Sequence, residues 1–211
     1  MSINLRKKTG INLKKGSSIN LEKKGTPLTS ICFGLNWGMK ERRGIGKIFG
    51  KVAVDLDGSM TMFAGNKAID TVYYKKLVSK DGSIRHSGDD TEGDSNGDDG
   101  YDNEIIRVHL PKVSSRVDSI WIYLNSYKQQ NFAEIPYSKI KVYEGTAKNI
   151  KDVLATFDLS SKPEFSKAVA MLMGKLVRKS NGWEFVAIGE PLAAKSISAI
   201  IESIKSDFLD A

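Results

Sequence analysis

The sequence contains little of what disulfide bonds, zinc sites and membrane spans require. Its one cysteine, Cys32, excludes an intrachain disulfide and leaves no basis for a cysteine-based zinc site. The two histidines, His86 and His109, leave little for the commonest transition-metal and acid–base chemistry. The chain has no apolar run of about 18 residues, and the lysine-rich segment after Met1 lacks the apolar stretch of a signal peptide. We therefore expect a soluble, cytoplasmic protein without a transmembrane segment.

Charge is abundant, and it is divided into two poles. The 211 residues have a net charge of +7. Residues 1–51, the basic pole, hold twelve lysines and arginines against two glutamates, a net charge of +10. Residues 81–104, the acidic pole, hold nine carboxylates against one arginine, a net charge of −8. The basic pole suggests a polyanionic partner, such as nucleic acid or an anionic membrane surface, whereas the acidic pole suggests a cation.

Strand patterns dominate the sequence. Apolar residues alternate most clearly at Ile120, Ile122 and Leu124, and the triplet 180–182, Ser-Asn-Gly, is a strong hairpin signal. An Ile-Asn-Leu repeat near the start has a period of 8 residues, which is too short for a helical repeat and fits small strands; its copies lie at residues 3–5, 11–13 and 19–21. Strand patterns occur at 29–37, 52–63, 71–74, 105–110, 119–127, 138–143, 153–158, 168–178 and 183–188. The sequence therefore predicts a mainly β fold, a two-sheet antiparallel β-sandwich.

One segment, residues 192 to 209, has helical periodicity. Its apolar residues fall at spacings of three and four on one face, so we expect a C-terminal amphipathic helix that packs on its own sandwich. The chain then divides into a basic N-terminal extension (1–10), a β-sandwich domain (11–191) and the C-terminal helix (192–211). The residues that we expect in the sandwich core are Ile31, Phe33, Val54, Ile120, Ile122, Leu124, Val142 and Phe185.

The acidic pole is concentrated in residues 86–104, where acidic residues alternate with glycines. Carboxylates packed this densely repel one another, so an ordered arrangement needs a cation, and Ca²⁺ takes six to eight oxygen ligands of this kind. An EF-hand is excluded, because with Asp94 in the first position the sixth residue is Asp99 instead of glycine. A solvated acidic loop without a specific ligand remains the alternative.

A second pair of carboxylates lies in a predicted strand. Asp55 and Asp57 are two residues apart, so both side chains point to one face of the strand. An exposed polar strand face is the alternative explanation for this pair.

Eight segments, taken in order, carry a family resemblance. They are Gly34-Leu-Asn-Trp37, Val54-Asp-Leu-Asp57, Lys80-Asp-Gly82, His86-Ser-Gly-Asp-Asp90, Gly97-Asp-Asp99, Asp102-Asn-Glu104, Gln130-Asn-Phe132 and Asn181-Gly-Trp183-Glu-Phe185. From about Ile11 to Leu192 the chain resembles the TerD family of tellurium-resistance and stress-response proteins. The family is similar to calcium-binding β-sandwiches. Ala53 stands where many members have a further aspartate.

The resemblance implies a non-enzymatic, calcium-dependent binding or scaffold module of the stress response. It implies one or two Ca²⁺ ions and protein partners in a stress-response complex, with the inner face of the membrane as an open alternative location. The metal ligands that it implies are Asp55, Asp57, Asp89, Asp94, Asp98, Asp99, Asp102 and Glu104.

No motif in the sequence supports an enzymatic function. Cys32 lies in an apolar strand pattern, where a core cysteine is expected rather than a nucleophile. The glycine-rich segment 44–50 lacks the Gly-Lys-Ser/Thr ending of a phosphate-binding loop. A metal-dependent hydrolase would need an open coordination site and a general base, which the sequence does not identify. The main alternative to calcium binding is therefore a polyanion-binding protein that uses the basic N-terminal pole.

Overall fold

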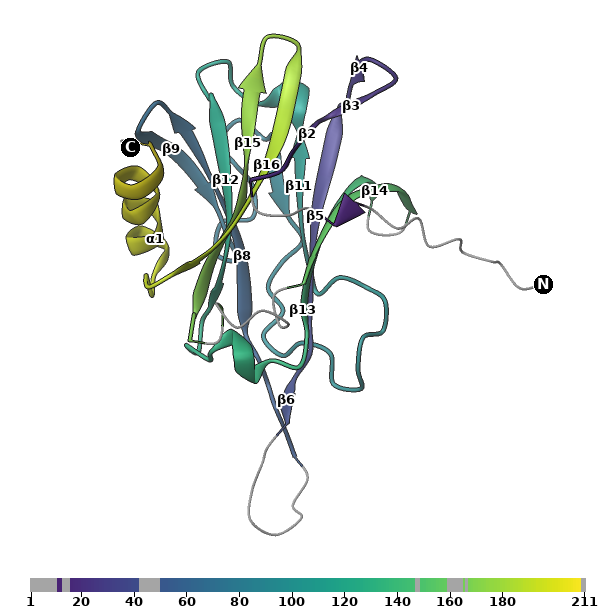
Figure 1. The fold of residues 1–211 in the computed structure, drawn as a ribbon, viewed down its shortest axis with the longest axis vertical. Helices are drawn as coiled ribbons and strands as arrows, with labels where there is room; N and C mark the ends of the chain where they lie inside the picture. Colours follow the sequence, from purple (N-terminus) through teal and green to yellow (C-terminus); the bar gives the residue numbers. More distant parts are fainter. Residues whose placement is uncertain are drawn as a thin grey trace, which may run out of the picture.

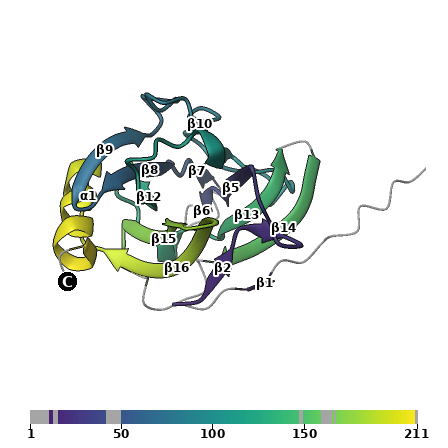
Figure 2. The same cartoon turned by 90° about the horizontal axis from the view of Figure 1, so that it is seen from above.

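The computed structural model describes residues 11–12, 16–41, 50–146, 149–158, 165 and 167–209. Two six-stranded sheets that face each other form the body of the fold (Figures 1 and 2). The first sheet has the order β1 (Ile11–Asn12), β14 (Asn149–Asp158), β13 (Ser138–Thr146), β5 (Ser30–Trp37), β11 (Glu104–His109) and β10 (Ile84–His86). The second has the order β2 (Ser18–Asn20), β16 (Gly182–Leu192), β15 (Ala170–Lys179), β12 (Ser119–Ser126), β8 (Leu56–Ala64) and β9 (Lys67–Val72).

Strand pairing within both sheets is antiparallel except between β1 and β14. Two small hairpins complete the strands: β3 (Glu22–Lys23) with β4 (Thr26–Pro27), and β6 (Lys40–Glu41) with β7 (Lys51–Val52). Short 3-10 helices lie at Leu110–Lys112 and Phe132–Glu134. The predicted mainly β, antiparallel two-sheet fold is therefore confirmed.

The Ile-Asn-Leu repeat supplies edge strands to both sheets. The second copy contributes β1, whose Ile11 pairs with Ala155 at the edge of the first sheet. The third copy contributes β2, whose Ile19 pairs with Phe185 at the edge of the second sheet. The first copy, at residues 3–5, and the extension 1–10 lie outside the described residues.

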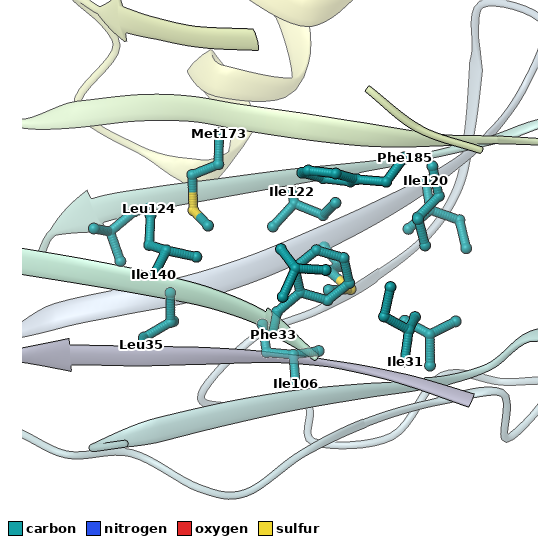
Figure 3. Close-up of a cluster of buried hydrophobic side chains, with 14 of the residues drawn as sticks. Ile31, Phe33, Leu35, Ile106, Ile120, Ile122, Leu124, Ile140, Met173 and Phe185 are labelled. Atoms are coloured by element: carbon teal, nitrogen blue, oxygen red, sulfur yellow. The ribbon is translucent and has the colours of Figure 1, made fainter. Parts of the chain in front are cut away.

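The core lies between the two sheets, and all eight residues that were expected there are buried. Figure 3 shows Phe33 from the first sheet and Phe185 from the second pointing toward each other, and their ring centroids lie 5.6 Å apart. Ile122 belongs to this cluster, whereas its neighbour Trp121 faces a second apolar cluster on the outer side of the sheet. Each fully buried side chain of this size stabilises the fold by about 1.5–3 kcal/mol. Because alternate residues of β12 face opposite sides of the sheet, the strand contributes to both clusters.

The C-terminal helix covers the outer side of the second sheet. Helix α1 (Ile197–Ile204) continues as a π-helical turn over Lys205–Leu209. Its buried residues Ile200 and Ile204 join Trp121 and Leu172 in the outer apolar cluster, as Figures 1 and 2 also show for the helix as a whole. The helix therefore packs on its own sandwich, as expected. Within the described residues, no helix has the length and apolar character needed to cross a membrane.

Several element boundaries differ from the sequence-based expectation. The helix begins at Ile197 instead of residue 192, because β16 continues to Leu192 through pairing with Ala170 and Ser196 caps the helix by accepting from the Ala199 N–H. The predicted strand 52–63 is interrupted, since β7 ends at residue 52 and β8 begins at residue 56. The expected strand at 71–74 is β9 at 67–72, and β10 was not predicted.

Candidate metal centre

The acidic loop, residues 87–103, connects β10 to β11 at the end of the sandwich that carries the β6–β7 hairpin (Figure 1). Its backbone is held by neighbouring strands and turns. The Asp94 N–H donates to the Trp37 carbonyl at 2.9 Å, and the Val54 N–H donates to the Glu92 carbonyl at 3.0 Å. These bonds bring the loop next to the segment that leads into β8.

Three carboxylates converge at the start of β8. Asp55 and Asp57 come from that strand and the turn before it, and Asp89 comes from the acidic loop. One ligand oxygen from each lies within 4.8 Å of the others. Asp55 and Asp57 are buried, whereas Asp89 is exposed, so the cluster opens to solvent on one side. The part of the chain that the structure describes contains no other group of three histidine, cysteine or acidic residues with this spacing.

The cluster is electrostatically unfavourable without a cation. Burial, together with the negative charges of Glu104, Asp55 and Asp89, raises the pKa of Asp57 to about 7. Burial also raises the pKa of Asp55, although the Lys128 ammonium group, 3.9 Å away, opposes this effect. A bound cation would remove this repulsion and favour the ionised carboxylates.

Glu104 lies near the cluster and acts on Asp57 through its negative charge. Its fully buried side chain accepts a hydrogen bond from the Gly58 N–H at 2.9 Å. The Gly88 N–H donates to His86 Nδ1, so a neutral imidazole carries its proton on Nε2, which lies 3.2 Å from the Gly58 carbonyl and 3.3 Å from Glu104 Oε2. A β-carbon on Gly58 would overlap the end of the buried Leu35 side chain, which would have to move to accommodate it.

Asp94 occupies a separate hydrogen-bonded group. Its carboxylate accepts from the Tyr137 hydroxyl at 2.7 Å, from Asn103 Nδ2 at 3.1 Å and from Asn36 Nδ2 at 3.4 Å. Asn103 also donates to Asp90, which sequence reasoning did not select. These contacts join the acidic loop to β5 and to the turn before β13.

The distal part of the loop is neutralised by lysines of β13. Lys139 lies 2.8 Å from Asp98 and holds the pKa of that carboxyl below its usual range. Lys141 lies 2.6 Å from Asp102, whose side chain rests on the β5 backbone. Asp99 accepts from the Tyr101 N–H instead. Of the eight residues that the resemblance implied, the structure thus brings Asp55, Asp57 and Asp89 together near Glu104 and leaves Asp94, Asp98, Asp99 and Asp102 elsewhere on the loop.

Sequence reasoning missed two residues beside the three-carboxylate cluster. Asn125, at the end of β12, donates to Asp57 Oδ2 at 3.1 Å, and Lys128 follows it in the next turn. The pairing of Asn125 with Asp57 across β12 and β8 creates this contact. A polar residue at the end of an apolar strand was the available signal, but the sequence does not specify which strand lies opposite.

The fold and the half-open carboxylate cluster together place the chain among β-sandwich proteins with a candidate metal centre at one end. The family model described as "TerD domain" matches residues 9–203, so the chain belongs to the TerD family, as its motifs indicated.

Similar proteins carry names from tellurium resistance and stress. "Tellurium resistance protein TerZ" of Serratia marcescens is 30% identical over 187 residues, which cover 87% of this chain and 91% of that protein. "General stress protein 16U" of Bacillus subtilis (strain 168) is 30% identical over 175 residues, covering 79% and 83%. These names describe resistance and stress proteins and not enzymes.

A solved structure shares the fold. The crystal structure of a homologue of telluride resistance protein (TerD) from Streptomyces coelicolor A3(2) aligns with a TM-score of 0.64. The alignment covers 85% of this chain and 96% of that chain at 16% sequence identity.

Proposed function

We propose that this protein is a calcium-binding β-sandwich module of the tellurium-resistance and stress-response type, with its ion at Asp55, Asp57 and Asp89. One observation carries the proposal: three carboxylates meet with oxygens within 4.8 Å, and two of them are buried with no ion-pair partner among the described residues nearer than Lys128, which lies 3.9 Å from Asp55. Buried charges need pairing or a metal ion. The proposed role is that of a non-enzymatic binding or scaffold protein.

The donor set favours calcium. Carboxylate and amide oxygens are hard ligands, and Ca²⁺ accepts six to eight of them in flexible geometry, whereas Mg²⁺ requires a near-ideal octahedron and retains its water. Two side-chain amide oxygens near the cluster, those of Asn125 and Gln130, are buried and have no hydrogen-bond partner in the part of the chain that the structure describes. The amide nitrogen of Asn125 bonds to Asp57, and that of Gln130 bonds to the Ala53 carbonyl at 3.1 Å. Both amides therefore lie beside the segment that supplies two of the carboxylates.

An ion at this position would link separate parts of the chain. Asp55 directly precedes β8 and Asp57 lies in it, whereas Asp89 belongs to the acidic loop. Binding would hold the loop against the sandwich and present a defined surface at this end. A calcium-dependent surface of this kind suits a scaffold that assembles with partners under stress.

Two lysines of the basic pole form ion pairs with acidic residues. Within the described residues, Lys23 pairs with Glu144 and Asp152, and Lys40 pairs with Glu134. Ammonium groups that are neutralised in this way contribute less to the attraction of a polyanion.

Calorimetric titration of the chelator-treated protein tests the proposal. We expect Ca²⁺ to bind at the three-carboxylate cluster with one ion per chain, and Mg²⁺ to bind at least about tenfold more weakly. A shift of a labelled DNA duplex or of anionic vesicles without any calcium heat would instead support the polyanion function. Absence of calcium heat at millimolar Ca²⁺ would refute the proposal.

A further inference from the structure

We propose that the open side of the metal centre binds a small anion that is joined to a planar ring, with the anion on the ion and the ring against Tyr74 and Tyr127. This inference rests on the proposed function, because the ion supplies one half of the site. It adds a ligand class that the carboxylate cluster alone does not specify.

The aromatic half is a group of tyrosines beside the cluster. Tyr127 follows β12, is 58% exposed, and donates its backbone N–H to the Asp55 carbonyl at 2.9 Å. Its ring centroid lies 5.9 Å from that of Tyr74, with an edge-to-face angle of 79°. Tyr74 contacts Tyr73 in the same manner at 5.5 Å. The backbone bond to Asp55 therefore fixes an exposed aromatic group at the border of the metal centre.

The ion would have coordination positions left for a ligand. If each of the three carboxylates binds through one oxygen and the amide oxygens of Asn125 and Gln130 also bind, the chain supplies five ligands, and Ca²⁺ accepts six to eight. Asp89 is the exposed member of the cluster, so the remaining positions face solvent on its side. An anionic oxygen of a ligand can replace water there.

The surrounding charges select an anion. Lys128 Nζ lies 3.9 Å from Asp55 and 3.4 Å from the Thr91 carbonyl, which belongs to the acidic loop. Lys75 Nζ lies 5.3 Å from the centroid of the Tyr74 ring. Ca²⁺ would offset two of the three carboxylate charges, and the two ammonium groups would add two positive charges, so this group sums to +1 and attracts negative charge to the edge of the tyrosine pair. A phosphate or carboxylate beside a planar ring fits both halves.

The contact between Tyr74 and Tyr127 sets them apart from an ordinary exposed aromatic residue. Single exposed aromatic residues are ordinary on protein surfaces. Tyr101 is such a residue: it is 71% exposed and lies between Asp98 and Asp102, the carboxylates that pair with lysines of β13. Tyr74 and Tyr127 differ from it because their rings contact each other and the Tyr127 backbone is hydrogen-bonded to Asp55. Tyr101 therefore provides a matched control.

The test uses the full chain with four probes: phenyl phosphate, benzoate, methyl phosphate and benzyl alcohol. Calcium binding is measured first by calorimetry, and then each probe is titrated with Ca²⁺ or with chelator. We expect phenyl phosphate or benzoate to bind at least about tenfold more tightly in Ca²⁺ than in chelator, and more tightly than either half-probe. The preferred ring anion identifies the ligand as a phosphate or a carboxylate.

Variants locate the ring. The double change Tyr74→Ala and Tyr127→Ala should weaken binding of the ring anion about fivefold or more, while the affinities for methyl phosphate and for Ca²⁺ stay unchanged. Tyr101→Ala should change none of these affinities. Normal calcium binding with equal affinities for the ring anions and methyl phosphate would overturn this inference alone. Absence of calcium binding would refute the proposed function, and this inference with it.

Discussion

Replacing Asp57 by asparagine should stabilise the protein in chelator and reduce its stabilisation by calcium. The substitution keeps the size of the side chain and an oxygen that can accept a hydrogen bond from Asn125. It removes a buried negative charge, because Asp57 is only 1% exposed. Burial and the neighbouring carboxylates raise the pKa of Asp57 from 3.8 to about 7 in the absence of a metal. Repulsion among the carboxylates therefore destabilises the native state until an ion binds.

The magnitude follows from proton linkage. In the native state Asp57 retains its proton to higher pH than in the unfolded chain, so the free energy of unfolding falls as the pH rises from 3.8 to about 7. At about 1.4 kcal/mol for each pH unit, the penalty above pH 7 reaches an upper value of roughly 4 kcal/mol. For a protein of this size, each kcal/mol corresponds to about 2–4 °C in melting temperature.

Thermal melts at pH 8 in chelator and in millimolar Ca²⁺ provide the assay. The wild type should gain about 2.7 kcal/mol at a calcium concentration of 100 times Kd, and Asp57→Asn should gain much less. Asp98→Asn is the matched control, because its carboxylate is paired with Lys139 outside the cluster, and it should change stability by less than about 1 kcal/mol in both conditions. If Asp57→Asn lowers the melting temperature equally in chelator and in calcium, repulsion among the carboxylates does not destabilise the metal-free protein.

Three further predictions concern the scaffold. Gly58→Ala should destabilise the fold by about 1–3 kcal/mol in urea titration, because the new methyl group would overlap Leu35; an unchanged midpoint would contradict this close packing. Ile200→Ala should cost about 2–4 kcal/mol in the same assay, since its fully buried side chain fixes α1 to the sheet, and a neutral effect would mean that the helix does not pack there. Although burial alone would raise the pKa of Asp70, hydrogen bonds from Lys76 and the backbone hold it below its usual value. The stability that Asp70 contributes is therefore complete above about pH 4 and lost at lower pH. Melts of Asp70→Asn should differ from the wild type at pH 7 and converge with it near pH 2, and a constant difference would refute this linkage.

The fold was predictable because its periodic signals are local. Ile120, Ile122 and Leu124 alternate along β12, and all three are buried between the sheets. The start of the helix was less predictable, because residues such as Leu192 suit a helical stripe as well as a strand, and pairing with Ala170 decides in favour of the strand. Tertiary pairing here overrides local periodicity.

The candidate site was predictable only in part for the same reason. The same-face spacing of Asp55 and Asp57 is a local property of an extended chain, and the structure places both in the cluster. The partners of the loop carboxylates depend on contacts between distant strands. Two lysines of β13, Lys139 and Lys141, neutralise Asp98 and Asp102. These partners are far apart in the sequence; Lys139 and Asp98 are separated by 41 residues. No motif in the acidic loop itself distinguishes a carboxylate that meets a lysine from one that meets other carboxylates.

The most direct test of the central claim is a calorimetric comparison of Ca²⁺ affinity among the wild type, Asp57→Asn and Asp98→Asn. The structure separates the cluster at the start of β8 from the lysine-paired part of the loop. We predict that Asp57→Asn weakens Ca²⁺ binding at the cluster by about tenfold or more, equivalent to at least ~1.4 kcal/mol, while Asp98→Asn changes it by less than about threefold. Equal losses in the two variants, or a larger loss in Asp98→Asn, would contradict the assignment of the ion to Asp55, Asp57 and Asp89.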